Sequence, residues 1–168
     1  MSYRYSRCRG AWAALGVGAV LAAAAHGASK PVHAHTLAAS MTTSPASGYS
    51  PGAWAHSLLA AADLPATRCN RAAIEAWETA EGGAWQNSAQ DNPLNTTMPE
   101  PGSWLVNGDG VRGYVSWASG LRATVATLGN GDYPSVVAAL ENGQNAQAVA
   151  NAVADSPWGT NRFEASCS

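Results

Sequence analysis

Lysine is almost absent from this chain of 168 residues, and its single copy, Lys30, lies near the start. Three of the nine basic residues, Arg4, Arg7 and Arg9, also precede residue 35. Without the first 34 residues, five arginines face eleven acidic side chains, so the net charge is about −6. An acidic domain without lysine is a poor ligand for nucleic acids and anionic membranes. We therefore expect no nucleic-acid partner.

No apolar run in the sequence is long enough for a comfortable membrane span. The longest run, Ala11–Ala25, follows a basic start and precedes Val32-His33-Ala34, where small residues occupy the −3 and −1 positions of a cleavage site. This order is typical of a secretory signal peptide, which we assign to residues 1–34, with cleavage after Ala28 as the alternative. We expect a protein secreted to the cell envelope, without a membrane anchor after cleavage.

Cysteine is scarce as well. Of three copies, Cys8 lies in the predicted signal peptide, which leaves Cys69 and Cys167. In an oxidising compartment an even pair indicates a disulfide, here between residues 98 apart, and two free thiols are the alternative. No cysteine and histidine group has metal-ligand spacing, so we expect neither a metal nor a cofactor. The early histidines are scattered: His33, His35 and His56.

The remaining sequence divides into a linker and one domain. Residues 35–50 are rich in Ala, Ser, Thr, Pro and Gly without periodicity, which indicates a flexible linker. Residues 51–168 can form a single core, and we expect a monomer. Apolar spacing and capping residues predict five helices in this domain. Their predicted N-terminal caps are Ser50, Asn70, Ser116, Asp132 and Asn145.

Between Ala84 and Val115 the chain shows turn signals instead of helical periodicity. Trp104–Val106 and Val111–Val115 flank an Asn-Gly turn and could pair as a short hairpin. The expected fold class is therefore mainly α, or α+β at most, with about five helices and a short irregular or β-hairpin excursion.

Glu81 is the anomaly of the second predicted helix, which ends at Gly82. At about 100° per residue, Ile74, Trp77 and Glu81 fall on one stripe, where a core-facing helix needs apolar residues. Burial beside Trp77, the negative end of the helix dipole and nearby Glu78 are all predicted to raise the pKa of Glu81. A carboxylic acid that stays protonated near neutral pH can act as a general acid. The alternative is a structural capping or salt-bridge partner.

The segment after Glu81 is rich in amide, hydroxyl and aromatic side chains. Sugars are bound by such sets, because polar groups contact the ring hydroxyls and aromatic faces cover the apolar ring faces. Trp117 and Trp158 could instead belong to the core. The candidate substrate-binding residues are Trp85, Asn92, Asn95, Thr96, Tyr114, Trp117 and Trp158.

An ordered set of motifs adds a resemblance. The set is Glu81-Gly82-Gly83, then Asn92-Pro93-Leu94-Asn95-Thr96-Thr97, then Val111 through Tyr114-Val115-Ser116-Trp117 with Gly120-Leu121. It resembles bacterial and phage cell-wall glycosidases of the lysozyme-like superfamily, especially glucosaminidase and lytic-transglycosylase types, over about Trp77 to Leu121, with Ser156 to Thr160 as a weaker match. Gly82 stands where many members have serine, and their Gly-Leu-Met-Gln-type segment is missing.

The resemblance implies a lysozyme-like fold and a peptidoglycan or other N-acetylated glycan as substrate. It makes Glu81 the catalytic general acid, places Asn92 and Asn95 at the border of the cleft, and puts Tyr114 near the scissile sugar. No second catalytic acid is obvious in the sequence, so a single-acid mechanism assisted by the substrate fits better. The alternative is a non-catalytic, secreted glycan-binding module on the same fold.

Overall fold

The computed structural model describes residues 50–82 and 88–168 of the chain. The predicted signal peptide, residues 1–34, lies outside the described residues, as do residues 35–49 of the predicted linker and Trp85. Within the described ranges, no helix is both long and apolar enough to cross a membrane.

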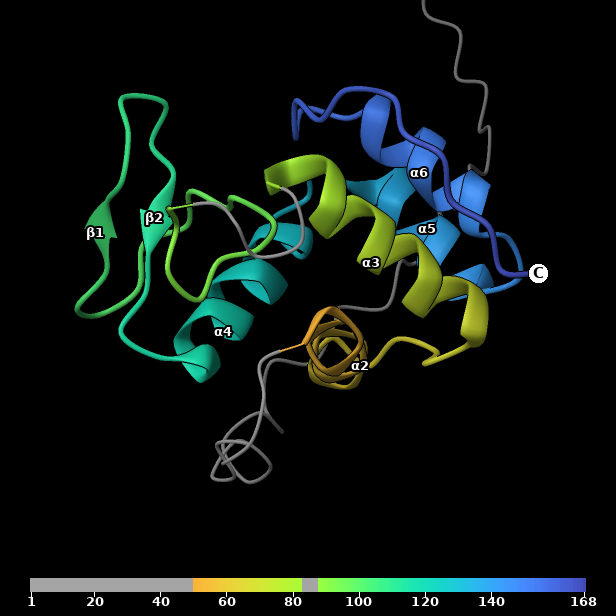
Figure 1. Ribbon diagram of the computed structural model, residues 1–168, viewed down its shortest axis with the longest axis horizontal. Helices are drawn as coiled ribbons and strands as arrows, with labels where there is room; N and C mark the ends of the chain where they lie inside the picture. The colour runs from red at the N-terminus through yellow and green to blue at the C-terminus, as the bar shows by residue number, and fades with distance from the viewer. Residues whose placement is uncertain (1–49, 83–87) are drawn as a thin grey trace, which may run out of the picture. The chain divides into compact units, whose positions relative to one another are not determined.

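Five helices and one two-stranded antiparallel sheet form the regular structure of the described residues, which confirms the predicted mainly α class (Figure 1). The helices are α2 (Pro51–Ala61), α3 (Arg68–Gly82), α4 (Trp117–Leu128), α5 (Pro134–Asn142) and α6 (Ala146–Ala154). The strands are β1 (Trp104–Leu105) and β2 (Arg112–Gly113).

Three helices begin at the N-cap residues that the sequence predicted. The side chains of Ser50, Ser116 and Asn145 each accept a hydrogen bond from a backbone N–H in the first turn of α2, α4 and α6, respectively. At α4, Ser119 completes a reciprocal capping box, which satisfies a second backbone donor. These starts are local features, and local sequence is sufficient to specify them.

Two predicted N-caps were wrong. The helix α3 begins two residues before Asn70, and the hydroxyl of Thr67 caps it by accepting from the Asn70 backbone N–H at 3.1 Å. The Asn70 side chain is buried instead, and its amide donates to the Leu140 carbonyl of α5 at 2.7 Å. Asp132 exchanges hydrogen bonds with Asn130 and makes none to the first turn of α5.

The core forms around α3, which packs against α2 and α6, while α2 also contacts α4 and α5 contacts α6. Figure 1 shows α3 crossing the view beside α2, which is seen along its axis. Trp54 of α2 and Trp77 of α3 are fully buried, and Trp117 meets Trp54 edge-to-face with 5.0 Å between ring centroids. Trp117 therefore belongs to the core, which was the alternative to its predicted sugar-binding role.

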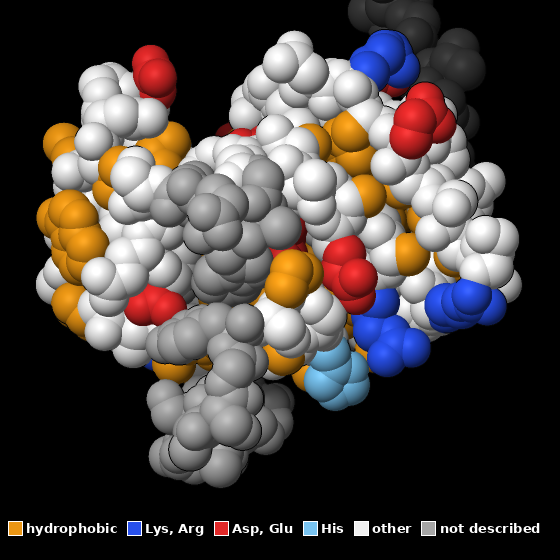
Figure 2. All heavy atoms as spheres, in the orientation of Figure 1, with side chains coloured by type: hydrophobic (Ala, Val, Ile, Leu, Met, Phe, Trp, Pro, Cys, Tyr) orange, Lys and Arg blue, Asp and Glu red, His pale blue; other side chains and the backbone are white. Residues whose placement is uncertain are grey.

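The hairpin strand β1 carries two of the three large apolar side chains that stay exposed in the described part of the chain, and Val115 after β2 is the third. Trp104 lies over Gly113 on the opposite strand, where any side chain would collide with the indole. Trp104 and Leu105 remain 42% and 61% exposed, and Figure 2 shows the apolar side chains at this edge. The predicted pairing around the Asn-Gly turn is confirmed, although the strands are shorter than the segments proposed.

The disulfide between Cys69 and Cys167 is present, as predicted from the cysteine count. It joins the first turn of α3 to the segment that follows α6, across 98 residues of sequence. Closing a loop of this length removes conformational freedom from the unfolded chain and contributes roughly 4–5 kcal/mol in the chain-entropy model.

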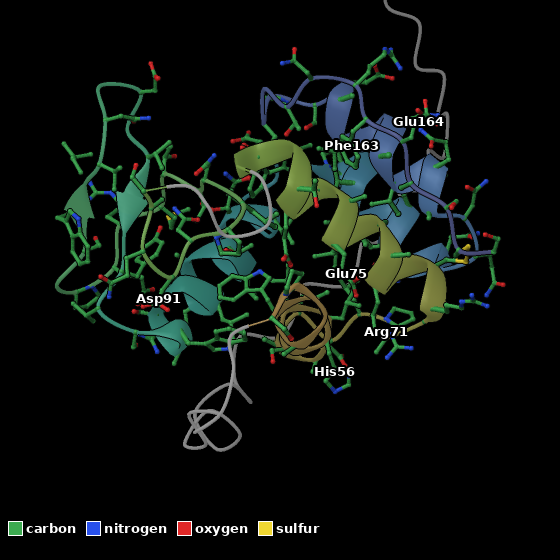
Figure 3. The ribbon with its side chains drawn as sticks, viewed as in Figure 1. His56, Arg71, Glu75, Asp91, Phe163 and Glu164 are labelled. Carbon is green, nitrogen blue, oxygen red and sulfur yellow. A yellow bond between two sulfur atoms is a disulfide. The ribbon has the colours of Figure 1, made fainter. Side chains whose placement is uncertain are left out.

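The polar loop of residues 88–98 rests on α4 at Gly120. A Cβ atom at this position would lie inside van der Waals contact of the Asp91 carbonyl oxygen. Figure 3 shows Asp91 beside the start of α4. Only glycine permits this approach, so Gly120 allows the loop backbone to lie directly against α4.

We therefore expect Gly120→Ala to push the loop away from α4 and to lower the free energy of unfolding by about 1–3 kcal/mol, as overpacking does in well-packed sites. Urea unfolding followed by circular dichroism measures the loss. Gly108→Ala is the matched control, because Gly108 has open space around it and its φ lies outside the left-handed region. Equal stability of the two variants would contradict the proposed contact.

Candidate functional site

Glu81 lies in the last turn of α3, half-buried, and both of its carboxylate oxygens accept hydrogen bonds. The Asn95 side-chain amide donates to Oε2 at 2.9 Å, and the Thr160 hydroxyl donates to Oε1. The donors come from the loop after α3 and from the segment after α6, so three distant parts of the sequence meet at one carboxylate.

The direction of the Thr160 hydrogen bond follows from its second partner. The Trp77 indole Nε1 lies 3.1 Å from the Thr160 hydroxyl oxygen, and an indole N–H can only donate. Thr160 therefore accepts from Trp77, and its own hydrogen is directed to Glu81. Trp77 is thus linked to Glu81 through Thr160, although the sequence predicted direct burial of the carboxyl beside the indole.

Asn95 is oriented by two acceptors on the same residue. Its amide nitrogen also donates to the backbone carbonyl of Glu81 at 2.7 Å, a group left without an intrahelical partner at the end of a helix. The backbone of Asn95 has a φ of 54°, in the left-handed region that asparagine tolerates better than most residues. Asn95 therefore caps α3 and holds the carboxylate with the same side chain.

The two side-chain donors leave part of the acceptor capacity of the Glu81 carboxylate unused. A carboxylate has about four acceptor positions, and the two neutral donors occupy only part of them. No ion pair involves Glu81 within residues 50–82 and 88–168, so the salt-bridge alternative is not observed there. A purely structural acceptor would make the same two hydrogen bonds.

Asn92 has a different position from the one the resemblance implied. Its side chain is completely buried, with its amide donating to the carbonyl oxygens of Thr96 and Arg112 at 2.8 and 2.7 Å. Its own side-chain oxygen accepts from the Thr96 backbone N–H at 2.9 Å. Because both ends are bonded inside the protein, we revise the role of Asn92 to holding the loop against β2.

Thr96 and Tyr114 are also buried rather than presented to a ligand. The Thr96 hydroxyl is hydrogen-bonded to Thr127 of α4, and the Tyr114 hydroxyl donates to the Met98 carbonyl at 2.7 Å. These contacts fasten the loop to α4 and to the segment after β2. As the structure stands, neither side chain offers an exposed polar group to a sugar.

Trp158 is half-buried and holds the loop from the other side. Its indole N–H donates to the Leu94 carbonyl at 2.9 Å, next to Asn95. Its ring meets Trp77 and Tyr133 edge-to-face, with centroids 4.6 and 5.0 Å away. Of the predicted substrate-binding residues in the described ranges, Trp158 and Asn95 alone keep partial exposure beside Glu81.

Sequence reasoning gave Thr160 no role in the site, and it missed Tyr133 and the burial of Glu78. Glu78, three residues before Glu81, is fully buried, whereas Glu81 is only half-buried. The spacing of four residues from Ile74 to Glu78 was a usable signal, since residues four apart share a helix face. Thr160 offered only a weak signal, because its partner lies 79 residues away. No group of three potential metal ligands occurs in the part of the chain that the structure describes.

Comparisons with protein-family models, with curated proteins and with solved structures found no match to the chain.

Burial raises the pKa of Tyr114 to about 12, although the neighbouring Arg112 guanidinium lowers it. An unfolded tyrosine titrates near 10, so the folded state holds this proton more tightly. The resulting stability is complete below about pH 10 and is lost as the pH rises towards about 12, by on the order of 2–3 kcal/mol.

Urea unfolding at about pH 8 and about pH 11 measures this effect. We expect the wild-type protein to lose more stability between the two conditions than Tyr114→Phe, which has no phenol to ionise at this site. The same loss in both proteins would assign the alkaline sensitivity to other groups.

Proposed function

We propose that the protein is a peptidoglycan-cleaving glycosidase in which Glu81 is the single general acid. The observation that carries the proposal is the half-exposed Glu81 carboxyl at the end of α3, held on both oxygens by neutral donors. The resemblance of its motifs to lysozyme-like cell-wall glycosidases of the glucosaminidase and lytic-transglycosylase types supports the same conclusion.

In the proposed reaction, Glu81 transfers its carboxyl proton to the oxygen that bridges two N-acetylated sugars. The bond from the anomeric carbon to that oxygen breaks while the ring gains oxocarbenium character. The N-acetyl group or the 6-hydroxyl of the substrate then bonds to the anomeric carbon. In the first case Glu81, now a base, removes a proton from water as the water displaces the N-acetyl oxygen from the anomeric carbon. In the second case Glu81 removes the proton of the 6-hydroxyl, and an anhydro sugar results.

The other residues of the site divide into positioning and contact roles in this proposal. Thr160 and Asn95 orient the Glu81 carboxyl, and the part-exposed Trp158 is the aromatic side chain placed to contact a sugar ring. Asn92 supports the loop from inside. The reaction requires no cofactor or metal ion.

The protein is proposed to act as a secreted monomer in the cell envelope. The disulfide fits an oxidising compartment, where such bonds form and persist. The predicted signal peptide and the acidic mature sequence are in keeping with export and with a glycan, rather than a nucleic acid, as partner.

We expect Glu81→Gln to lower the release of soluble fragments from purified peptidoglycan by about 10²–10⁴-fold, the usual contribution of a general acid. Glutamine can still accept from Thr160 but has no acidic proton to give. Its amide nitrogen also faces the Asn95 amide, so one hydrogen bond is lost, and circular dichroism must show that the fold persists. Glu141→Gln on the exposed surface of α5 is the matched control and should retain full activity.

The competing function is a non-catalytic glycan-binding module, which is favoured by the structural hydrogen bonds that already engage Glu81. A binding module would sediment with peptidoglycan and release no fragments, and Glu81→Gln would leave the sedimentation unchanged. That pair of results would contradict the enzymatic proposal.

A further inference from the structure

The segment of residues 155–168, which we call the C-terminal strap, has neither helix nor strand yet completes the candidate site. Thr160 bonds to Glu81 in the last turn of α3, and Cys167 is joined to Cys69 in its first turn. The strap therefore runs along the length of α3 in the opposite direction, and Figure 1 shows it as the dark blue trace ending at the C-terminus.

Trp158 and Thr160 attach the first half of the strap to the loop and to Trp77, and the disulfide attaches its distal half. Gln147 of α6 holds its backbone at two points, donating to the Phe163 carbonyl at 3.2 Å and accepting from the Ala165 N–H at 2.9 Å. The ion pair between Arg162 and Asp155 is largely exposed, and such pairs contribute little. Arg68 of α3 also donates to the Ser168 carbonyl, so the disulfide, Gln147 and Arg68 attach the distal half of the strap.

We infer that the Cys69–Cys167 disulfide and Gln147 are positioning groups for the cleavage reaction, because they hold Thr160 against Glu81. Reducing the disulfide frees the strap, removes the Thr160 hydrogen bond from the carboxylate and slows turnover. The inference rests on the proposed function for its effect on catalysis. Its structural part, the release of Thr160, stands independently.

We expect the helical core to stay folded when the strap is released. Its fully buried apolar residues come from α2 to α6 and the loop, apart from Ala165 of the strap, while Trp158, Phe163 and Cys167 of the strap are partly buried against them. Reduction itself is a balanced exchange with a dithiol reagent. The dithiol gives two electrons and two protons, the two cysteines become thiols, and the reagent closes to its own disulfide.

This dependence would couple activity to the compartment. The pair is stable in oxidising surroundings and is kept reduced in a reducing cell interior. The site would therefore be completed where the glycan lies, and the same chain would be a weak catalyst before export.

The test compares oxidised and dithiol-reduced protein on purified peptidoglycan. We expect reduction to lower kcat about tenfold, which corresponds to about 1.4 kcal/mol of transition-state stabilisation, with little change in KM. Thr160→Val should reproduce the reduced level while oxidised. The double variant Cys69→Ser, Cys167→Ser should show the same low level and no response to the dithiol, which controls for effects of the reagent on the assay.

Gln147→Ala tests the same positioning with the disulfide intact. It should lower kcat in the same direction by a smaller factor, and it avoids the loss of stability that accompanies removal of a disulfide. Gln147→Glu keeps the acceptor for the Ala165 N–H and loses the donor to Phe163, so it should fall between the wild-type protein and Gln147→Ala.

A readout without catalysis separates this inference from the proposed function. The Trp77 indole N–H bonds to Thr160, so its signal in a ¹H–¹⁵N spectrum should exchange slowly with solvent in oxidised protein and rapidly after reduction. An unchanged Trp77 signal, or unchanged turnover in the reduced protein and in Gln147→Ala, would overturn the inference. If the oxidised protein cleaves no glycan while the Trp77 signal responds, the proposed function fails and the structural inference holds.

Discussion

The pair of hydrogen bonds on the Glu81 carboxylate is the constraint on which the site depends. Thr160 donates to one oxygen and Asn95 to the other. The Trp77 indole N–H donates to the Thr160 hydroxyl oxygen and so orients the hydroxyl hydrogen towards Glu81. These contacts join the end of α3 and the loop that follows it to the C-terminal strap, which is distant in the sequence. The two hydrogen bonds hold the carboxylate in one orientation.

The rest of the structure keeps the two donors in place. Asn92 holds the loop closed from inside, Gly120 lets it approach α4, and Trp158 ties it to the strap through the Leu94 carbonyl. The polar residues that the sequence suggested for sugar contact are therefore divided by burial. Those that are completely enclosed shape the loop that carries Asn95, and Asn95 and Trp158 stay partly exposed.

The sequence predicted what is local. Helix starts at Ser116 and Asn145, the hairpin and the mainly α class follow from caps, turns and periodicity, and Glu81 stood out because an acid ended an apolar stripe. What it could not predict depends on packing between distant segments. Asparagine is a common N-cap residue, but the Asn70 side chain is hydrogen-bonded to α5 instead. Thr160 takes part in the site only through Glu81, which is 79 residues away in the sequence. The lysozyme-like resemblance stays a prediction.

The central claim is that this carboxyl cleaves a glycosidic bond, and mass spectrometry of the soluble material released from purified peptidoglycan tests it most directly. The account predicts new disaccharide-containing fragments whose ends are either reducing or anhydro sugars, depending on whether water or the 6-hydroxyl completes the reaction. Intact peptidoglycan, recovered with the folded protein bound to it and with no new sugar ends, would contradict it.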